Sequence, residues 1–318
     1  MSDHRHILCL AGGVGGGKLA RGLAAVLPPE RLTVVVNTAD DFVHLGLHVS
    51  PDIDSVLYAM AGVNDPERGW GLAGETWNFM AALERLGGAT WFRLGDRDLA
   101  THLLRTEWLA SGRSLSEATA LLARRHGVAH RVAPMTDDCV RSTVATDQGA
   151  LKFQDYFVRR RCEPVFQGVT FEGAAQARPS AAFRDALGCA DAVVIAPSNP
   201  FVSIDPILAL PGIKDALRAR RVPVVAVSPI VGGRAVKGPL AKMMRERGIE
   251  PSPLAVARHY RGLVHGWIVD AADRALATPI EALGCRVAVA DTMMRTPDDM
   301  ARLARDALAH ALSPEPVG

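Results

Sequence analysis

Short runs of apolar, largely β-branched residues alternate with longer amphipathic stretches along most of this 318-residue chain. This alternation predicts parallel strands joined by crossover helices. The run at 32–36 is almost unbroken in β-branched residues, which indicates a strand covered on both faces. The expected strands are residues 6–11, 32–36, 191–196, 222–227, 267–270 and 286–290, with a first helix over 18–27. The pattern therefore predicts an α/β fold with a doubly wound, Rossmann-like, mostly parallel sheet.

The middle of the chain departs from this alternation in two places. Residues of about 55–130 read as a helical insertion, with helices expected at 75–86, 99–110 and 114–125 and a short strand at 90–94. The sequence Ser114-Leu-Ser-Glu117 is a capping box that opens the third helix. Residues of about 140–172 read as a small antiparallel β excursion, with strands at 141–146 and 150–158 around a turn at 147–149. Because no repeat or linker-like stretch is visible, we expect one domain over 1–318.

Composition excludes several classes of protein. Lys plus Arg total 36 and Asp plus Glu 34, a net charge of +2, which argues against binding to nucleic acid or to a membrane surface. No apolar run approaches the ~20 residues that span a bilayer, and none near the start resembles an export signal. The five cysteines form no C-x-x-C pair, so we expect no disulfide framework, no zinc site and a cytoplasmic location.

A glycine-rich turn, Ala11-Gly-Gly-Val-Gly-Gly-Gly-Lys18, joins the first strand to the first helix. Glycines let the backbone approach a ligand closely, and the free N–H groups of a helix start favour an anion. A P-loop would need Ser or Thr at Leu19, and Gly15-x-Gly17-x-x-Ala20 fits only a loose dinucleotide fingerprint. A tight turn with no ligand is the alternative, but this many glycines favour phosphate binding. The candidate residues are Gly12, Gly13, Gly15, Gly16, Gly17 and Lys18.

Four aspartates follow the second strand. Asn37-Thr-Ala-Asp-Asp41 lies just beyond its carboxyl end, where open α/β sheets place ligands, and Ser50-Pro-Asp-Ile-Asp-Ser55 comes shortly after. Carboxylates on neighbouring loops beside a phosphate site suit Mg²⁺. Alternatively, Asp52 or Asp54 caps a helix that begins near Ile53. The set is Asp40, Asp41, Asp52 and Asp54.

Further polar clusters allow two interpretations each. Arg93-Leu-Gly-Asp-Arg-Asp98, followed by Thr101-His102, either braces itself or binds a polar substrate. In Pro197-Ser-Asn-Pro200, Ser198 and Asn199 offer hydrogen bonds to phosphate, ribose or a base. The segment 228–237 is either an anion-binding loop or a plain surface loop. Its candidate residues are Gly232, Gly233, Arg234 and Lys237.

Tryptophan and histidine positions add less. Four of the five tryptophans fall in the inserted region, where a flat aromatic ligand can stack: Trp70, Trp77, Trp91 and Trp108. His44 and His48 fall in an expected loop with a structural role. The zinc-hydrolase H-E-x-x-H motif and the G-x-S-x-G elbow do not occur, so neither hydrolase class is expected.

Taken in order, these motifs resemble the 2-phospho-L-lactate transferase family, which builds coenzyme F-420, over nearly the whole chain. The resemblance rests on long motifs rather than on one glycine turn. They are Gly12-Gly-Val-Gly-Gly16, Val36-Asn-Thr-Ala-Asp-Asp41, Ser50-Pro-Asp-Ile-Asp-Ser-Val-Leu-Tyr58, Gly69-Trp-Gly71, Glu75-Thr-Trp77, Leu94-Gly-Asp-Arg-Asp-Leu-Ala-Thr-His102, Pro197-Ser-Asn-Pro200 and Ser228-Pro-Ile230.

The resemblance implies a Mg²⁺-dependent enzyme acting on two substrates. One is the deazaflavin 7,8-didemethyl-8-hydroxy-5-deazariboflavin (FO), and the other is a guanosine diphosphate ester of a three-carbon acid. The terminal ribityl hydroxyl of FO attacks the phosphorus that bears the acid, and GMP leaves. A homodimer is also implied. Whether the acid is lactyl, enolpyruvyl or glyceryl stays open.

Roles carry over onto matching positions of this sequence. The resemblance implies that Asp40 and Asp52 hold the metal and that Asp54 and Arg93 bind the deazaflavin. Gly12 to Gly17 would cradle the diphosphate, with Lys18 as a further phosphate contact. Ser198 and Asn199 would touch the nucleotide, and our hypothesis is that Asp54 orients or deprotonates the attacking hydroxyl.

Two other functions remain open from the sequence. One is a regulatory relative that binds a nucleotide-sugar diphosphate on the same scaffold. The other is a Rossmann dehydrogenase that uses residues 15–20 for a dinucleotide. The aspartates at 52 and 54 and the 94–102 motif favour the transferase.

Overall fold

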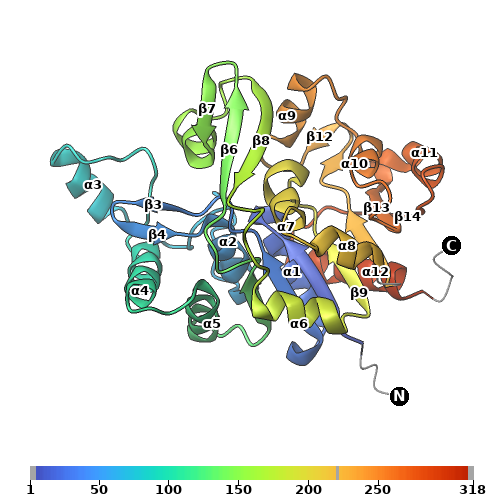
Figure 1. Cartoon of the computed structure of the whole chain (residues 1–318), viewed down its shortest axis with the longest axis horizontal. Coiled ribbons are helices and arrows are strands. Elements are labelled where there is room, and N and C mark those ends of the chain that lie inside the picture. The colour runs from blue at the N-terminus through green and yellow to red at the C-terminus, as the bar shows by residue number, and fades with distance from the viewer. Residues whose placement is uncertain (1–4, 220–221, 314–318) are drawn as a thin grey trace.

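A seven-stranded parallel sheet forms the centre of the computed structural model, which describes residues 5–219 and 222–313 (Figure 1). The strands lie in the spatial order β14-β13-β10-β9-β1-β2-β5. Their bounds are β1 (Ile7–Ala11), β2 (Leu32–Val36), β5 (Arg131–Pro134), β9 (Ala192–Ile195), β10 (Val224–Val227), β13 (Gly266–Asp270) and β14 (Arg286–Ala290). All neighbouring pairs are parallel. The strand order reverses between β1 and β9, so the predicted doubly wound α/β fold is confirmed.

Helices cover both faces of this sheet. Alternate residues of each strand belong to two separate apolar clusters, as the two-residue period of a strand requires. In β1, Leu8 and Leu10 pack into one cluster, while Ile7 and Cys9 pack into the other. Helices α1 (Gly13–Val26), α2 (Pro51–Ala61), α5 (Leu115–Arg125) and α12 (Pro297–Leu312) complete the second cluster. Helices α6 (Ala181–Cys189), α8 (Ile213–Ala219) and α10 (Pro253–His259) belong to the first. Because both faces are buried, the strands consist almost entirely of apolar residues.

The helices vary in length from one turn to more than four. Their bounds are α1 (Gly13–Val26), α2 (Pro51–Ala61), α3 (Asn78–Arg85), α4 (Asp98–Ala110), α5 (Leu115–Arg125), α6 (Ala181–Cys189), α7 (Asp205–Leu208), α8 (Ile213–Ala219), α9 (Leu240–Glu246), α10 (Pro253–His259), α11 (Ala277–Glu281) and α12 (Pro297–Leu312). Shorter 3₁₀ and π segments are Pro29–Arg31, Ala271–Leu276, Asp155–Arg159 and Pro200–Ile204. Within the described residues, no helix is both long and apolar enough to cross a membrane.

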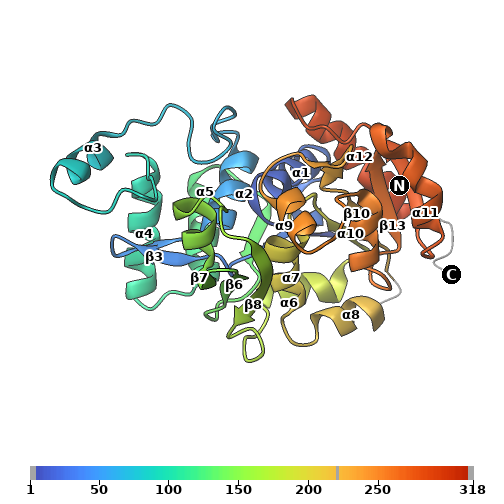
Figure 2. The ribbon, with the colours of Figure 1, turned by 90° about the horizontal axis from the view of Figure 1, so that it is seen from above.

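Two excursions leave the central body. The hairpin of β3 (Phe42–His44) and β4 (Leu47–Val49) extends together with α3 and α4 as an arm on the left of Figures 1 and 2. A three-stranded antiparallel sheet in the order β7-β6-β8 rises from the body at the top of Figure 1. Its strands are β6 (Arg141–Thr146), β7 (Gly149–Lys152) and β8 (Phe166–Glu172). A two-stranded ladder of β11 (Ile230–Val231) and β12 (Arg234–Ala235) follows β10.

The structure corrects several local predictions. The short strand predicted at 90–94 is wrong, because these residues run irregularly into α4. The strand predicted at 150–158 ends at Lys152, and a π turn over Asp155–Arg159 follows it. The first helix begins at Gly13 instead of residue 18, so the glycines predicted to form a turn belong to its first turns.

Two elements were not predicted from the sequence, the 42–49 hairpin and the strand β5, and one predicted helix cap is present. The 42–49 hairpin contains His44 and His48, which were expected in a loop. The edge strand β5 was not predicted, since its four residues carry little pattern. The capping box of Ser114 and Glu117 is confirmed, with both reciprocal hydrogen bonds present.

Candidate active site

A cavity of about 740 Å³ opens at the carboxyl ends of the parallel strands, beside the loops that follow the neighbouring strands β1 and β9. This is the position at which open α/β sheets bind ligands. Its lining residues are drawn from eight stretches of chain, not every residue of which contributes. They are 12–18, 40–58, 68–71, 91–102, 153–161, 197–203, 228–240 and 292–295. The cavity therefore draws on residues from nearly both ends of the described chain.

The glycine turn forms one wall of the cavity. Gly12 is the N-cap of α1 and has no side-chain cap, so N–H groups of the first turn face the cavity without an intrahelical partner. A Cβ at Gly12 would lie 2.3 Å from Oδ2 of Asp52, and one at Gly15 would lie 2.3 Å from the carbonyl oxygen of Pro197. Gly13 has a φ of +61°, in the left-handed region. Close approach and backbone conformation therefore require glycine at these three positions.

The other two glycines of the predicted cradle serve a different purpose. Gly16 and Gly17 are buried and do not line the cavity. A Cβ at Gly17 would lie 2.9 Å from the carbonyl oxygen of Ser55 and 3.0 Å from Cβ of Ala59, so this residue lets α1 pack closely on α2. Of the glycines predicted to cradle phosphate, Gly12, Gly13 and Gly15 line the cavity, and Gly16 and Gly17 do not.

The loop after β9 is bonded directly to the glycine turn. The Ser198 hydroxyl accepts a hydrogen bond from the Gly12 N–H at 3.1 Å and donates one to the Gly12 carbonyl oxygen at 2.8 Å. The Asn199 side chain accepts from the N–H of Phe201 at 3.0 Å and so caps the π turn that follows. Both side chains line the cavity, as predicted for nucleotide contacts, and both also brace its wall.

Two of the predicted metal-binding aspartates converge on a single amide. Nδ2 of Asn37 donates to Oδ1 of Asp40 at 3.2 Å and to Oδ2 of Asp52 at 3.0 Å. Both carboxylates are buried, and both line the cavity beside the start of α1. Asp41 does not line it. Its carboxylate accepts hydrogen bonds from Ser50 at 2.7 Å and is paired with His48 at 3.1 Å.

Burial and mutual repulsion disfavour the charged forms of Asp40 and Asp52 and so raise the pKa of both carboxyl groups. Burial raises the pKa of Asp52 to about 7. Burial, followed by the charges of Asp52 and Asp41, raises the pKa of Asp40 well above its usual range. Two buried carboxylates with raised pKa values fit a divalent cation, whose charge would offset their repulsion.

The number of ligands restricts which metal this pair fits. Among the described residues, no group of three or more His, Cys, Asp or Glu side chains is arranged to hold a metal ion. Mg²⁺ commonly binds through one or two carboxylates together with substrate phosphates and water. The donor set of Asp40 and Asp52 fits that mode and does not fit an all-protein metal cage.

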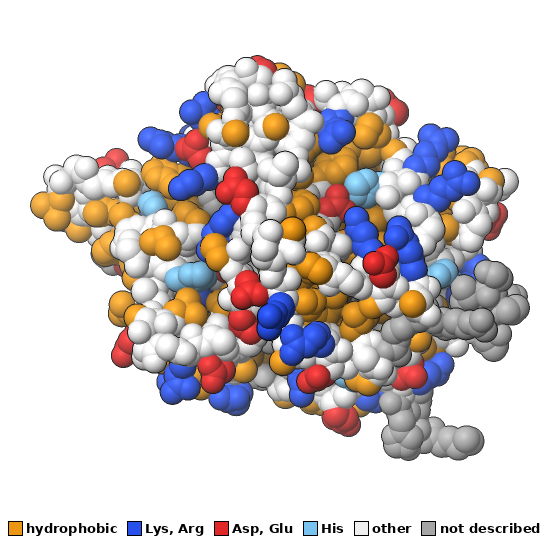
Figure 3. Space-filling view, viewed as in Figure 1, with side chains coloured by type: hydrophobic (Ala, Val, Ile, Leu, Met, Phe, Trp, Pro, Cys, Tyr) orange, Lys and Arg blue, Asp and Glu red, His pale blue; other side chains and the backbone are white. Residues whose placement is uncertain are grey.

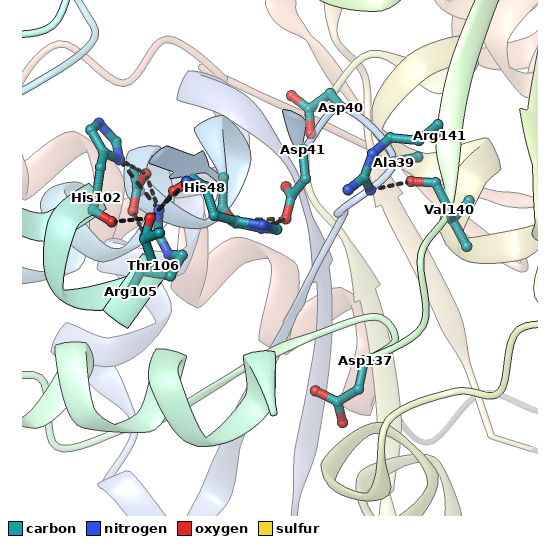
Figure 4. A network of polar contacts seen from close by, with 12 residues as sticks. Ala39, Asp40, Asp41, His48, His102, Arg105, Thr106, Asp137, Val140 and Arg141 are labelled. Carbon is teal, nitrogen blue, oxygen red and sulfur yellow. Dashed lines mark hydrogen bonds and ion pairs between the residues drawn. The ribbon is translucent and has the colours of Figure 1, made fainter. Parts of the chain in front are cut away.

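Asp54 also lines the cavity, and its carboxylate is held by Arg105, which does not line it. Its two oxygens pair with the two terminal nitrogens of Arg105, one at 3.1 Å and the other closer still. Nδ1 of His102 lies 3.7 Å from Oδ2 of Asp54. Arg105 is completely buried and donates also to the backbone oxygen of His48 at 3.4 Å. Figure 4 shows His102, Arg105 and His48 together on the side of Asp41 that faces away from Arg141.

The 94–102 motif builds the support for this group. Asp96 accepts hydrogen bonds from the N–H groups of Asn78 and Phe79 and so anchors the start of α3. Glu75 accepts from the N–H groups of Arg97 and Asp98 at 2.8 Å, which fixes the start of α4. Most of the motif therefore braces the arm. Of its polar side chains, Asp98 and His102 line the cavity, together with the preceding Arg93.

Aromatic and cationic side chains form the opposite wall. The Arg93 guanidinium lies 4.4 Å from the ring centroid of Trp77, and that of Arg68 lies 5.1 Å from the same ring. Trp70, Trp91 and Phe157 line the cavity. A face of this kind can stack a flat conjugated ligand and hold its polar groups by positive charge.

A bridge crosses the mouth of the cavity between distant segments. Nζ of Lys237 donates to the backbone oxygen of Arg68 at 3.3 Å. Nζ of Lys18 donates to the carbonyl oxygen of Met294 at 2.8 Å. Burial, followed by the charge of Lys237, lowers the pKa of Lys18. Two ammonium groups that repel each other at one cavity favour an anionic ligand there.

The structure thus gathers most of the predicted site residues around one cavity. They are Gly12, Gly13, Gly15, Lys18, Asp40, Asp52, Asp54, Arg93, Ser198 and Asn199. Residues singled out from the sequence that do not line it are Gly16, Gly17, Asp41, Trp77, Trp108, Gly232, Gly233 and Arg234. Sequence reasoning missed Arg68, Arg105 and Phe157. A signal for Arg105 was available in the sequence. It is an arginine on the apolar side of a helix, three residues after His102.

Comparison with known proteins agrees with this geometry. A sequence profile of the family described as 2-phospho-L-lactate transferase CofD matches residues 7–297. A phosphoenolpyruvate transferase of Streptomyces griseus is 43% identical over 308 residues, covering 95% of this chain and 97% of that protein. A 2-phospho-L-lactate transferase of Methanosarcina acetivorans is 40% identical over 298 residues, covering 94% of this chain and 96% of that protein.

Solved structures share the fold of this chain. A crystal structure of a UPF0052-family protein from Bacillus halodurans superposes with a TM-score of 0.62 at 15% identity. It covers 97% of this chain and all of the other one. At this identity the likeness concerns the fold alone.

Proposed function

This chain belongs to the CofD family of 2-phospho-L-lactate transferases and is a transferase, and from that premise we propose its substrates and reaction. It transfers a phospho-(three-carbon acid) group from a guanosine diphosphate ester to the terminal ribityl hydroxyl of FO, releases GMP, and serves coenzyme F-420 biosynthesis. The dehydrogenase and regulatory alternatives drop out with the transferase assignment.

The observation that carries the proposal is the convergence of Asp40 and Asp52 on Asn37 beside the glycine turn. A diphosphate needs backbone N–H donors and a counter-charge. The start of α1 supplies the donors, and Asp40 and Asp52 would hold a Mg²⁺ ion as the counter-charge. The N–H groups of the first turn of α1, which have no partner within the helix, follow Gly12. Lys18 and Lys237 add positive charge at the same cavity. We therefore assign this end to the guanosine diphosphate ester.

The aromatic wall is assigned to the deazaflavin. Trp70, Trp91 and Phe157 offer flat apolar surfaces, and Arg93 offers a guanidinium held in place by Trp77. Asp54 lines the same cavity, and in the proposed reaction the acceptor hydroxyl meets the diphosphate beside it. We propose that Asp54 accepts a hydrogen bond from that hydroxyl and so directs its oxygen toward phosphorus.

The reaction is an in-line displacement. A bond forms between the ribityl oxygen and the phosphorus that bears the acid, and the bond from that phosphorus to the bridging oxygen breaks, so that GMP leaves with this oxygen. The hydroxyl proton passes to solvent water. Mg²⁺, held by Asp40 and Asp52, would neutralise charge on the diphosphate and the departing GMP. Positioning and charge neutralisation supply most of the catalysis in such transfers. The chain's own contribution is to hold the diphosphate on the glycine turn and the hydroxyl on Asp54.

A homodimer is also proposed. Large apolar side chains stay exposed on the arm formed by α3, α4 and the β3–β4 hairpin, with Leu86 86%, Val43 67% and Leu103 59% exposed. Hydrophobic side chains gather on that part of the surface, on the left of Figure 3. Exposed apolar groups concentrated on one projection are typical of a contact surface, and a second copy of the chain is the proposed occupant.

The test is direct incubation of the protein with FO, Mg²⁺ and each guanosine diphosphate ester in turn. Release of GMP together with FO heavier by the phospho-acid group is the expected result. Relatives bearing the lactyl and the phosphoenolpyruvyl names resemble this chain almost equally. The esters are therefore compared by kcat/KM in one competition assay. Failure of every ester to react, with protein shown to be folded, would overturn the proposed function.

A further inference from the structure

Arg105 is the one arginine side chain with zero exposure among the residues described, and it does not itself line the cavity. It comes from the inner side of α4, which belongs to the arm, and it reaches Asp54 at the start of α2 across 51 positions of sequence. A guanidinium buried in this way is costly unless a carboxylate pairs with it, and such pairs add little to net stability. A role in geometry is therefore the better explanation of this contact.

The pairing fixes the direction of one carboxylate. Nη1 of Arg105 donates to Oδ2 of Asp54, and Nη2 donates to Oδ1, so both oxygens of the carboxylate are held by one guanidinium. Two parallel hydrogen bonds of this type restrict rotation more than a single contact does. The remaining lone pairs of Asp54, which lines the cavity, then have a defined direction.

Contacts on the side of His102 and Asp54 restrain the arginine, whereas its Nε atom is buried without a hydrogen-bond partner. His102 lies one turn earlier on α4, with Nδ1 3.4 Å from Nη1 of Arg105. Nε2 of His102 lies 3.3 Å from Asp98, which also accepts a hydrogen bond from the Tyr58 hydroxyl at 2.5 Å. The Glu75 carboxylate holds the first N–H groups of α4. Movement of Arg105 therefore requires movement of α4.

We propose that Arg105 is a positioning residue for the acceptor substrate, acting through Asp54. It sets the orientation in which Asp54 receives the hydroxyl-bearing substrate, and it connects the arm to the reacting centre. This inference rests on the proposed function, because it assigns the acceptor end of the cavity to a deazaflavin alcohol. It adds a residue that touches neither substrate.

The experiment compares Arg105→Lys, Arg105→Gln, Asp54→Asn and the double variant Asp54→Asn/Arg105→Gln with the wild type. Affinity for FO is measured by fluorescence titration, the KM of each substrate by steady-state kinetics, and folding by Tm. Arg113→Gln, an exposed arginine just beyond α4, is the matched control. We expect Arg105→Lys to raise Kd and KM for FO about tenfold, because one ammonium cannot hold both oxygens. The KM of the guanosine ester should stay within about twofold of the wild type.

The double variant separates positioning from folding. It removes both charges, so no unpaired ion stays buried if Arg105→Gln alone unfolds. Since Arg105 acts through Asp54, the double variant should bind FO within about twofold of Asp54→Asn alone. A loss of folded protein would lower kcat without changing either KM.

Three results would overturn the inference. Arg105→Lys could keep the FO affinity of the wild type, the KM of both substrates could rise together, or the double variant could lose affinity by the full product of the single losses. If the wild type turns over FO and any of these results appears, only the inference fails. If the wild type neither binds nor modifies FO, the proposed function fails and the inference with it.

Discussion

The Ser198 hydroxyl bonds both backbone groups of Gly12, accepting from its N–H at 3.1 Å and donating to its carbonyl oxygen at 2.8 Å. This pair joins the loops that follow β1 and β9 at the point where the sheet reverses its strand order. There is also no space for a side chain at Gly12, because its Cβ would lie 2.7 Å from Cβ of Ser203.

Replacing Gly12 by alanine should therefore disable the site. In Gly12→Ala the new methyl group displaces Asp52, whose Oδ2 lies 2.3 Å from the Cβ position. We expect kcat to fall by about 100-fold, as small displacements of reacting groups cause. Gly188→Ala is the control, because nothing lies within 4 Å of its Cβ position. Equal activity of the two variants, measured by GMP release, would contradict the close contact with Asp52.

Asp52→Asn should exchange activity for stability. Burial raises the pKa of Asp52 to about 7, so the folded chain disfavours the charged carboxylate there. Asparagine resembles the neutral acid and keeps an oxygen that can accept from Asn37. We expect turnover to fall by about 100-fold or more and Tm at pH 8, without metal, to rise by about 2 °C. A lower Tm in differential scanning calorimetry would show that the carboxylate contributes net stability.

The free energy of unfolding should decrease as the pH falls, because of His265 and His310, neither of which lines the cavity. Burial, followed by the charge of Arg286, lowers the pKa of His265 and of His310. Nδ1 of His265 accepts a hydrogen bond from the Val224 N–H at 3.0 Å, so protonation there would break a contact in the sheet. The unfolded chain takes up protons first as pH falls below about 6.5, so the free energy of unfolding falls with it.

The variant His265→Asn tests this linkage. Its side-chain oxygen can still accept from Val224 but cannot be protonated in this range. We expect the free energy of unfolding, from urea titrations between about pH 7 and pH 5, to depend less on pH than in the wild type. An unchanged slope would show that the acid sensitivity lies elsewhere.

Lys237→Gln should weaken binding of the anionic substrate. The variant removes one of two ammonium groups at the cavity and the bridge to Arg68. We expect the KM of the guanosine ester to rise about fivefold, an effect of partly screened charge, while the KM of FO changes less. Lys214→Gln, an exposed lysine on α8, is the control. If both variants behave alike, Lys237 makes no contribution to donor binding.

Leu103→Glu should separate the proposed dimer. Leu103 is exposed on α4, and a carboxylate there would have to be buried at any contact formed by the arm. We expect the molar mass from light scattering to fall from two chains to one at micromolar concentration. Glu107→Gln on the same helix is the control. A monomeric wild type, or a dimeric Leu103→Glu, would exclude this surface as the contact.

Much of the sheet could be predicted because it is buried on both faces. The runs at 7–11 and 32–36 are continuous apolar segments, so their type and bounds follow from burial alone. The arm offers no such signal, since the β3–β4 hairpin has strands of only three residues. The π turn at 155–159 has no reliable sequence pattern, so its segment was assigned to a strand.

The candidate site divides in the same way. The strand-end rule predicts that Asp40, just after β2, lies at the ligand edge of the sheet. Asp52 lies in the first turn of α2, and the structure shows that both carboxylates accept from one amide. The partner of Asp54 could not be predicted, because Arg105 approaches from a helix whose position depends on the packing of the arm. Likewise, the packing role of Gly17 is visible only once α2 lies against α1.

The lining of the cavity runs from Gly12 to Arg295. During synthesis, a ribosome must therefore release nearly the entire polypeptide before any substrate finds a place to bind. Once both ligands are bound, they connect the earliest and latest segments of the chain, so occupancy should protect the whole molecule against proteolysis and heat, and not one local region.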